Sequence, residues 1–427
     1  MRSWIKSSAG NFLTAGVAGM LSRLVSLITI SYLIRTLGPA PFGKLGFSET
    51  LVTYFMLISD LGLQTIGLRE IARISEDKQA VRRLVSTILV VQFLFTTLLF
   101  GIIELTTWFI LAIDLQARLL ITLYGIGLLF PYVFTIEWWL NGTYRLGITG
   151  IGRLIRELLF LVLTLLLVHT QADLLWVPLA QGLAWVFIAS LICIFFIHET
   201  NNRSNIRSMW DWGSAQNLLQ LSWPIAISGV ISHLWIRSGI IHLGMVESDS
   251  SIGLYNAAWR IFAVGLELTS MGSLLVIPWF SRLAGVDDKQ FRQVFRYYQA
   301  LSIILAVVSV VIGTVLRDFV ITLLFGDASL PMRPVFSLLM IALGCWMVSS
   351  SFFVPLIATR FERTVMLLTG ICALICIGLN FLLIPVMGSS GAALALATSM
   401  LTLIFLSAFS YVQLLGRTIN VRPVLSI

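Results

Sequence analysis

The chain has 427 residues, of which 58% are hydrophobic and only 11% are charged, and its formal net charge is +8. Soluble domains carry about 25% charged residues, so this composition excludes a cytosolic enzyme, a nucleic-acid binder and a receptor with a single membrane anchor. The sequence indicates a protein that lies in a lipid bilayer and has no room for a separate soluble domain.

Long apolar stretches recur along the whole chain. A helix needs about 20 apolar residues to cross a bilayer. By this criterion we predict an all-α integral membrane protein with twelve transmembrane helices. In chain order these cover residues 11–37, 42–68, 84–103, 117–140, 147–168, 174–198, 218–243, 252–277, 296–318, 334–358, 364–385 and 389–414.

The charges between the predicted spans indicate an orientation. If the N-terminus is cytoplasmic, most of the 28 lysines and arginines fall on the cytoplasmic side of the membrane. Cytoplasmic loops of membrane proteins are rich in these residues. The sequence therefore predicts a multi-pass protein whose N- and C-termini are both cytoplasmic.

An internal repeat divides the chain. Leu37-Gly38 and Phe42-Gly43 precede the second predicted span, and Leu243-Gly244 and Ile252-Gly253 precede the eighth. Six spans separate the copies, so both copies have the same orientation, as in parallel repeats related about the membrane normal. We predict two six-helix bundles related by a pseudo-two-fold axis, with a central cavity. The expected boundaries are residues 1–198, a cytoplasmic linker at 199–217, and residues 218–427.

Charged residues inside the predicted spans are candidates for transport. A charge at the bilayer centre costs roughly 2.5–3.5 kcal/mol on insertion scales, so it usually faces a cavity or a partner. Arg23 shares a helix face with Gly16, Gly19 and Ser26. This face is either the lining of a cavity or a packing surface of small residues with one paired arginine.

The seventh and eighth predicted spans carry further candidates. His233 and Arg237 lie four residues apart, and Asn256, Arg260 and Glu267 share one face of the next helix. We expect the two arginines and Asn256 to line the substrate cavity. His233 is either a packing residue or a protonation site, and Glu267 is a candidate for a salt bridge or for ion coupling.

Two other positions complete the candidate set. Asp60, in the second span, has three open roles: it pairs with an arginine, carries a coupling proton or caps the region that starts at Gly62. Trp138, beside Trp139, belongs to an interfacial aromatic belt or stacks on a sugar. The four cysteines lie in apolar runs, no histidine or further cysteine joins Cys372 and Cys376 on their helix face, and no phosphate-binding loop occurs, so we predict no metal, no cofactor and no ATP hydrolysis by this chain.

Ordered short motifs run along nearly the whole chain. They are Gly10-Asn11, Leu37-Gly38 with Phe42-Gly43, Asp60-Leu61-Gly62-Leu63, Arg69-Glu70-Ile71-Ala72-Arg73, Glu137-Trp138-Trp139-Leu140-Asn141-Gly142, Ile252-Gly253-Leu254-Tyr255-Asn256-Ala257-Ala258, and Asn380-Phe381-Leu382-Leu383-Ile384-Pro385 with Gly388 and Gly391. In this order and spacing, the sequence resembles the Wzx-type O-antigen flippases of the multidrug/oligosaccharidyl-lipid/polysaccharide superfamily.

The resemblance implies a function and a set of partners. The cargo would be a polysaccharide repeat unit linked to undecaprenyl pyrophosphate, moved from the cytoplasmic to the periplasmic leaflet of the bacterial inner membrane by alternating access. Ion coupling through Asp60, Glu267 or His233 is inherited from the superfamily as a hypothesis, as is association with a polysaccharide polymerase and a chain-length regulator. No nucleic acid is expected as a partner.

Two alternatives stay open at this point. A multidrug exporter of the same superfamily would share the fold, although three arginines within the spans do not suit cationic drugs. A polytopic polysaccharide polymerase would be an enzyme, but such enzymes need a sizeable outer loop with catalytic charges, and the outer loops predicted here are short. We therefore expect a transporter rather than an enzyme.

Overall fold

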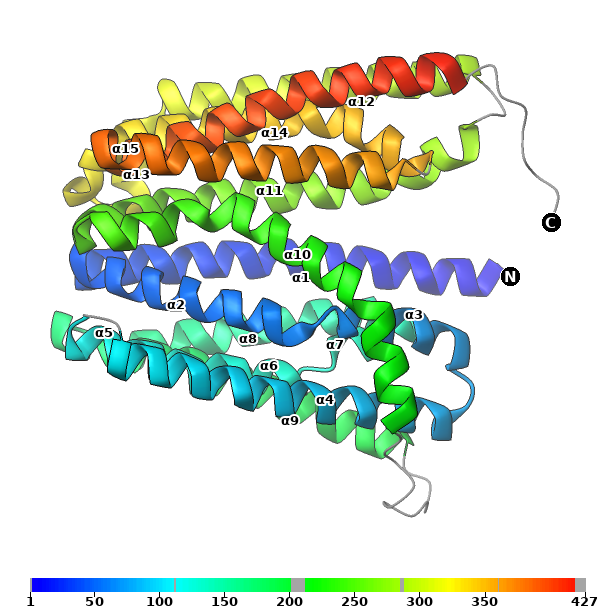
Figure 1. The fold of residues 1–427 in the computed structure, drawn as a ribbon, viewed down its shortest axis with the longest axis horizontal. Helices are drawn as coiled ribbons and strands as arrows, with labels where there is room; N and C mark the ends of the chain where they lie inside the picture. Colours follow the sequence, from blue (N-terminus) through cyan, green and yellow to red (C-terminus); the bar gives the residue numbers. More distant parts are fainter. Residues whose placement is uncertain (1, 111–112, 201–211, 285–287, 360, 419–427) are drawn as a thin grey trace. The chain divides into compact units, whose positions relative to one another are not determined.

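The computed structural model describes residues 2–110, 113–200, 212–284, 288–359 and 361–418, and within these ranges the chain is helical without any strand (Figure 1). It divides into two compact units, Met1–Val230 and Ile231–Ile427. The boundary lies inside one helix, later in the chain than the linker predicted at 199–217. Residues 201–211 of that linker lie outside the described residues.

The first unit contains a series of long helices and short helical segments. These are α1 (Arg2–Leu37), α2 (Pro39–Asp60), α3 (Leu63–Ile74), α4 (Lys78–Leu105), η1 (Thr106–Ile110), α5 (Leu115–Tyr124), η2 (Gly125–Leu129), α6 (Phe130–Phe134), α7 (Glu137–Gly142), α8 (Leu146–Leu167), η3 (Gln171–Leu175) and α9 (Trp176–Thr200). Helix α10 (Trp212–Val246) begins in this unit and ends in the next.

The second unit has fewer and longer helices. After the end of α10 come α11 (Asp249–Leu283), α12 (Asp288–Thr314), α13 (Arg317–Phe325), η5 (Asp327–Met332), α14 (Arg333–Ala358) and α15 (Glu362–Thr418). Helix α14 is the centre of this unit and packs against α11, α12 and α15.

Among the described residues, nine helices are long and apolar enough to cross a membrane, or ten if the bent pair α2 and α3 forms one span. The predicted span 147–168 is helical but is not among these candidates, and the predicted spans 364–385 and 389–414 are counted as one. Helix α8 carries Arg153, Arg156 and Glu157 within 22 residues. Helix α15 consists of two helices that meet at Gly388, where the backbone is not helical (φ 57°, ψ −136°). The prediction of a helical multi-pass membrane protein is confirmed, and the count of twelve stays a prediction.

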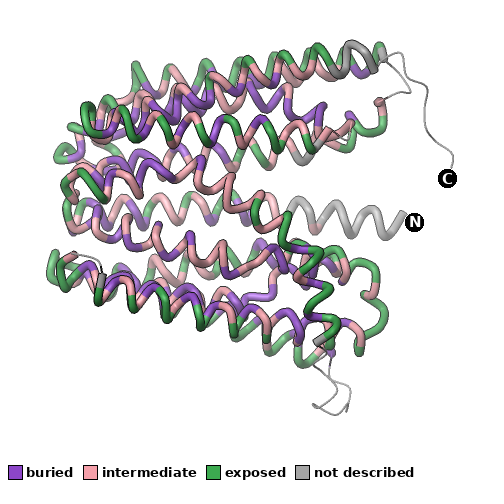
Figure 2. The backbone as a smooth tube through the Cα atoms, viewed as in Figure 1, coloured by how far each residue is buried: buried purple, intermediate pink, exposed green. Residues whose placement is uncertain are grey.

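Each unit has an apolar core built from one face of its helices. In α4, the buried residues Val81, Val85, Ile88, Gln92 and Thr96 recur every three or four positions, which places them on one side of the helix. Figure 2 shows this alternation of buried and exposed residues along the helices of both units. Two polar side chains on the buried side of α4 indicate that the interior of the first unit is not purely apolar.

The break between α2 and α3 depends on one glycine. Leu61 (φ 50°) and Gly62 (φ 71°) both have left-handed backbone conformations, and the two helices meet at an angle of 44°. A Cβ atom at Gly62 would lie 2.6 Å from the carbonyl oxygen of Ser222 and 3.0 Å from the backbone nitrogen of Ala226. The break therefore lies directly against the first part of α10.

Candidate functional site

Two of the predicted arginines lie within the candidate membrane spans of α10 and α11 in the second unit. Arg237 is nine residues before the end of α10 at Val246, and Arg260 is eleven residues after the start of α11 at Asp249. At 1.5 Å per residue these positions are about 14 Å and 17 Å from the turn that joins the two helices. If the turn lies at the edge of the hydrocarbon core, which is about 30 Å thick, both arginines are at mid-depth. Both side chains are partly exposed.

An aromatic ring supports Arg237. Its guanidinium carbon lies 3.9 Å from the centre of the Trp259 ring, and the indole N–H of that buried tryptophan donates to the carbonyl of Ile236 at 3.4 Å. A cation over an aromatic face gains about 2 kcal/mol when it is desolvated. The indole lowers the cost of placing the guanidinium in the membrane.

Asn256 lies one turn before Arg260 on the same face of α11. Its residue is only 1% exposed, and neither its amide nitrogen nor its amide oxygen has a hydrogen-bond partner among the described residues. A buried polar group without a partner costs about 1–3 kcal/mol. The amide can therefore be satisfied by water or by a bound molecule, and it is adjacent to a mid-depth arginine.

The other predicted residues of α10 and α11 lie at different depths. His233 is one turn from Arg237, further from the α10–α11 turn, and is half-buried. Glu267 is seven residues beyond Arg260, about 10 Å further along α11. The structure thus groups Arg237, Asn256 and Arg260 near one level of the membrane and places Glu267 towards the far end of the span.

Arg23 lies beside the packing surface of α1. That surface faces α8: a Cβ at Gly150 would lie 2.8 Å from the Cα of Ala15, and Ser22 is buried. Arg23 is turned about 100° from Ser22 around the helix and is half-buried. A Cβ at Gly16 would contact nothing within 4 Å, whereas Gly19, one turn before Arg23, is buried, so both readings of the face that carries Arg23 stay predictions.

Asp60 lies at the break between α2 and α3. Its side chain accepts a hydrogen bond from the side-chain amide of Gln92 at 3.0 Å. Within the described residues Asp60 forms no ion pair. Its role among the three that the sequence left open therefore stays a prediction.

Trp138 is a core residue of the first unit. It is 3% exposed and belongs to an apolar cluster with Leu63, Ile88 and Trp139. A Cβ at Gly67 would lie 2.6 Å from its ring, so the helix α3 rests directly on the indole. A ring covered in this way has no free face for a sugar, and it does not lie in an exposed aromatic belt.

The structure reveals an arginine that the sequence analysis did not single out. Arg156 is eleven residues before the end of α8, about 17 Å from it and therefore near the middle of this 22-residue helix. Its guanidinium carbon lies 4.1 Å from the centre of the Trp185 ring, and its Nη2 atom is 3.3 Å from the Glu157 carboxylate. Arg156 and Glu157 are adjacent charges within an apolar stretch of the sequence, and this pattern could have marked the position. Each unit thus holds an arginine over an indole.

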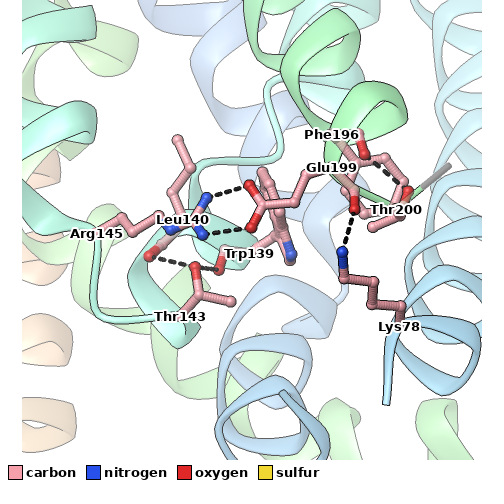
Figure 3. Close-up of polar contacts among 8 residues, drawn as sticks. All are labelled: Lys78, Trp139, Leu140, Thr143, Arg145, Phe196, Glu199 and Thr200. Carbon is pink, nitrogen blue, oxygen red and sulfur yellow. Dashed lines mark hydrogen bonds and ion pairs between the residues drawn. The ribbon is translucent and has the colours of Figure 1, made fainter. Parts of the chain in front are cut away.

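A cluster of three charged residues, Lys78, Arg145 and Glu199, lies at the end of the first unit near the predicted linker. Figure 3 shows the guanidinium of Arg145 facing both carboxylate oxygens of Glu199, and Lys78 donating to the Glu199 carbonyl at 3.0 Å. The hydrogen bonds to Glu199 raise the pKa of Arg145 above its ordinary value, although burial acts in the opposite direction. These contacts connect the starts of α4 and α8 to the end of α9, and they are structural.

Comparison with solved structures identifies the fold. The chain superposes on the lipid II flippase MurJ in an inward closed conformation with a TM-score of 0.76 and 14% identity, over 93% of this chain and 87% of that one. It superposes on an inward-facing multidrug resistance MATE family transporter with a TM-score of 0.72 and 13% identity, over 95% and 98% of the two chains. The fold is that of transporters of the multidrug/oligosaccharidyl-lipid/polysaccharide superfamily.

Sequence comparison identifies the family. Residues 8–284 match the family model described as polysaccharide biosynthesis protein, and the chain belongs to that family. It is 22% identical over 241 residues to a protein of Escherichia coli (strain K12) described as a "Putative O-antigen transporter". That match spans 55% of each chain, so the chain covers about half the length of this relative. These relatives and structural neighbours are transporters and flippases, not enzymes.

Proposed function

We propose that this protein is a flippase for polysaccharide repeat units linked to undecaprenyl pyrophosphate. It moves them from the cytoplasmic to the periplasmic leaflet of the bacterial inner membrane, and both of its termini are cytoplasmic. The observation that carries the proposal is the presence, in a chain of the polysaccharide biosynthesis family, of an arginine over an indole in each unit: Arg237 on Trp259, and Arg156 on Trp185 with Glu157 beside it.

The chemistry of the cargo explains the need for these arginines. A pyrophosphate and a sugar chain would leave many unsatisfied polar groups and at least two negative charges in hydrocarbon. The planar guanidinium group binds phosphate oxygens through two parallel N–H bonds, which a lysine cannot do. Arg260 and the amide of Asn256 add donors near the same level as Arg237.

The mechanism follows from the fold class. We infer twelve spans in two bundles of six, which expose a central cavity to one side of the membrane at a time. The pyrophosphate and sugars cross through this cavity, while the polyprenyl chain stays in the lipid. Ion coupling through Glu267, His233 or Asp60 belongs to this proposal, as does association with a polysaccharide polymerase and a chain-length regulator. Transport into liposomes that ignores imposed ion gradients would refute the coupling.

The decisive experiment is deletion of the chain in its host, followed by location of the lipid-linked repeat unit. We expect the glycolipid to accumulate on the inner leaflet. Accumulation of single repeat units on the outer leaflet would indicate a polymerase. Unchanged polysaccharide with increased sensitivity to cationic drugs would indicate a multidrug exporter.

Single substitutions test the role of the arginines. Arg156→Ala, Arg237→Ala and Arg260→Ala should each reduce transport by about 10- to 100-fold, because a hydrogen bond to a charged group contributes roughly 1.5–3 kcal/mol. The corresponding lysine variants should recover only part of the activity. Arg73→Ala, which removes an exposed ion pair with Glu70, is the control. Full surface polysaccharide in all three alanine variants would contradict the proposal.

A further inference from the structure

A cationic cavity lies at the start of α12, away from the mid-depth arginines. It has a volume of about 680 Å³, and the described residues that line it are Lys289, Arg292, Gln293, Arg296 and Tyr297. These residues are three, four, seven and eight positions apart, so they occupy one face of the helix. Sites for small molecules usually have volumes of 300–1,000 Å³, so this cavity is large enough for a ligand bigger than a single phosphate.

The opposite face of α12 is fixed in the core of the second unit. The ring of Phe291 lies 5.1 Å from that of Phe280, and the ring of Phe295 stacks on Tyr411 at 4.4 Å. The hydroxyl of Tyr298 lies 3.0 Å from the hydroxyl of Ser273. These contacts prevent α12 from rotating about its axis, so the cationic face is held outward.

Among the side chains that the structure describes, none forms an ion pair with the three cations of the cavity. Lys289, Arg292 and Arg296 are exposed. Like charges three and four residues apart on a helix destabilise it slightly. An arrangement of two guanidinium forks and one ammonium group is suited to an anion with several phosphate oxygens.

An exposed apolar stripe continues from the cavity along the same helix. The membrane-spanning part of α12 begins at Lys289, so the cations lie at its end. Beyond Tyr297 the exposed residues Leu301, Ile304, Val308 and Val311 follow at helical spacing. A polyvalent cationic site that leads into an apolar stripe is complementary to a lipid with an anionic headgroup and a long chain.

We propose that this face of α12 is a docking site for the pyrophosphate headgroup of the polyprenyl-linked cargo, before the cargo enters the central cavity. This inference rests on the proposed function. The polyprenyl chain lies along the apolar stripe, and Gln293 and Tyr297 offer neutral hydrogen-bonding groups to the first sugar. Three cations suit a pyrophosphate better than the single charge of a common anionic phospholipid.

The test uses the full chain in nanodiscs of phosphatidylcholine and a photoreactive analogue of farnesyl pyrophosphate, with cross-linked peptides mapped by mass spectrometry. We expect cross-links to α12 in the wild type and a loss of at least about tenfold in the double variant Arg292→Gln, Arg296→Gln. The control, Arg69→Gln with Arg83→Gln, removes two equally exposed charges on α3 and α4 outside the cavity and should cross-link as the wild type does.

Two competitors identify the ligand. A tenfold excess of phosphatidylglycerol, or of inorganic pyrophosphate, should leave most of the α12 cross-link in place. Displacement of the cross-link by phosphatidylglycerol would show that the site binds bulk anionic lipid and would overturn the inference. Displacement of the cross-link by inorganic pyrophosphate to the same extent would refute the proposal that the apolar stripe is part of the site. Cross-links to α10 or α11 without any to α12 would overturn this inference alone. A wild-type protein with no cross-link at all would overturn the proposed function as well.

Discussion

Gly62→Ala should destabilise the first unit more than any ordinary helix substitution. A residue other than glycine destabilises the protein by about 1–2 kcal/mol when it adopts the left-handed backbone conformation that Gly62 has. The added Cβ would also lie 2.6 Å from the Ser222 carbonyl oxygen and 3.2 Å from the Cβ of Ile225, and overpacking typically costs 1–3 kcal/mol. The backbone atoms of α10 cannot rotate away as a flexible side chain can. We therefore expect a loss of about 2–5 kcal/mol in the free energy of unfolding.

The measurement is denaturant unfolding of the purified variant in detergent, compared with the wild type. Gly16→Ala is the matched control, because Gly16 lies within α1 and a Cβ there meets nothing within 4 Å. Alanine is the better helix former by about 0.5–1 kcal/mol, so this variant should be as stable as the wild type or slightly more stable. If Gly62→Ala unfolds at the wild-type denaturant concentration, the packing of the α2–α3 break against α10 is wrong.

Three further predictions concern polar groups. Glu199→Gln should lower the free energy of unfolding by about 1 kcal/mol, because the ion pair of Glu199 with Arg145 is only partly buried. In 1 M NaCl the difference in unfolding free energy between the variant and the wild type should be smaller. A difference that does not change with salt would contradict an ionic contribution. Burial raises the pKa of Asp114, but the hydrogen bonds from Lys44 and the backbone outweigh it and hold that pKa below its ordinary value. The stability that Asp114 supplies is thus present above about pH 4 and is lost as the pH falls through the lowered pKa, so the Tm of Asp114→Asn should lie below that of the wild type at pH 7 and converge with it in acid. Asn256→Leu should keep or raise stability by about 1 kcal/mol, since it removes a buried polar group without a partner, yet abolish transport; retained transport would exclude Asn256 from the cargo path.

Apolar length predicted most of the helices, because the bilayer sets how long a spanning helix must be. The expected spans 84–103 and 296–318 correspond to α4 and α12. The predicted span 117–140 is a single apolar run in the sequence, but the structure divides it into α5, η2, α6 and part of α7. Such divisions depend on backbone contacts with neighbouring helices. The packing of Gly127 against Gly182, for example, is not visible in either local sequence.

The candidate site was harder to predict, because charge type and spacing do not show which neighbour a side chain meets. The depths of Arg237 and Arg260 followed from their places in the predicted spans. The indole beneath Arg237 could not be inferred, since Trp259 belongs to the next helix. The sequence also did not distinguish the exposed rings of an aromatic belt from Trp138, whose burial depends on the closeness of Gly67 in α3.

The contact between Arg237 and Trp259 makes the indole a built-in optical reporter. The emission of tryptophan responds to a charge near its ring, and here the guanidinium carbon lies 3.9 Å from the ring centre. Any anion that draws the guanidinium away will alter the local electric field at that ring. The chain has 13 tryptophans, so a variant that keeps Trp259 and replaces the others with phenylalanine would let the arrival of a phosphate at mid-membrane be followed in real time without a label.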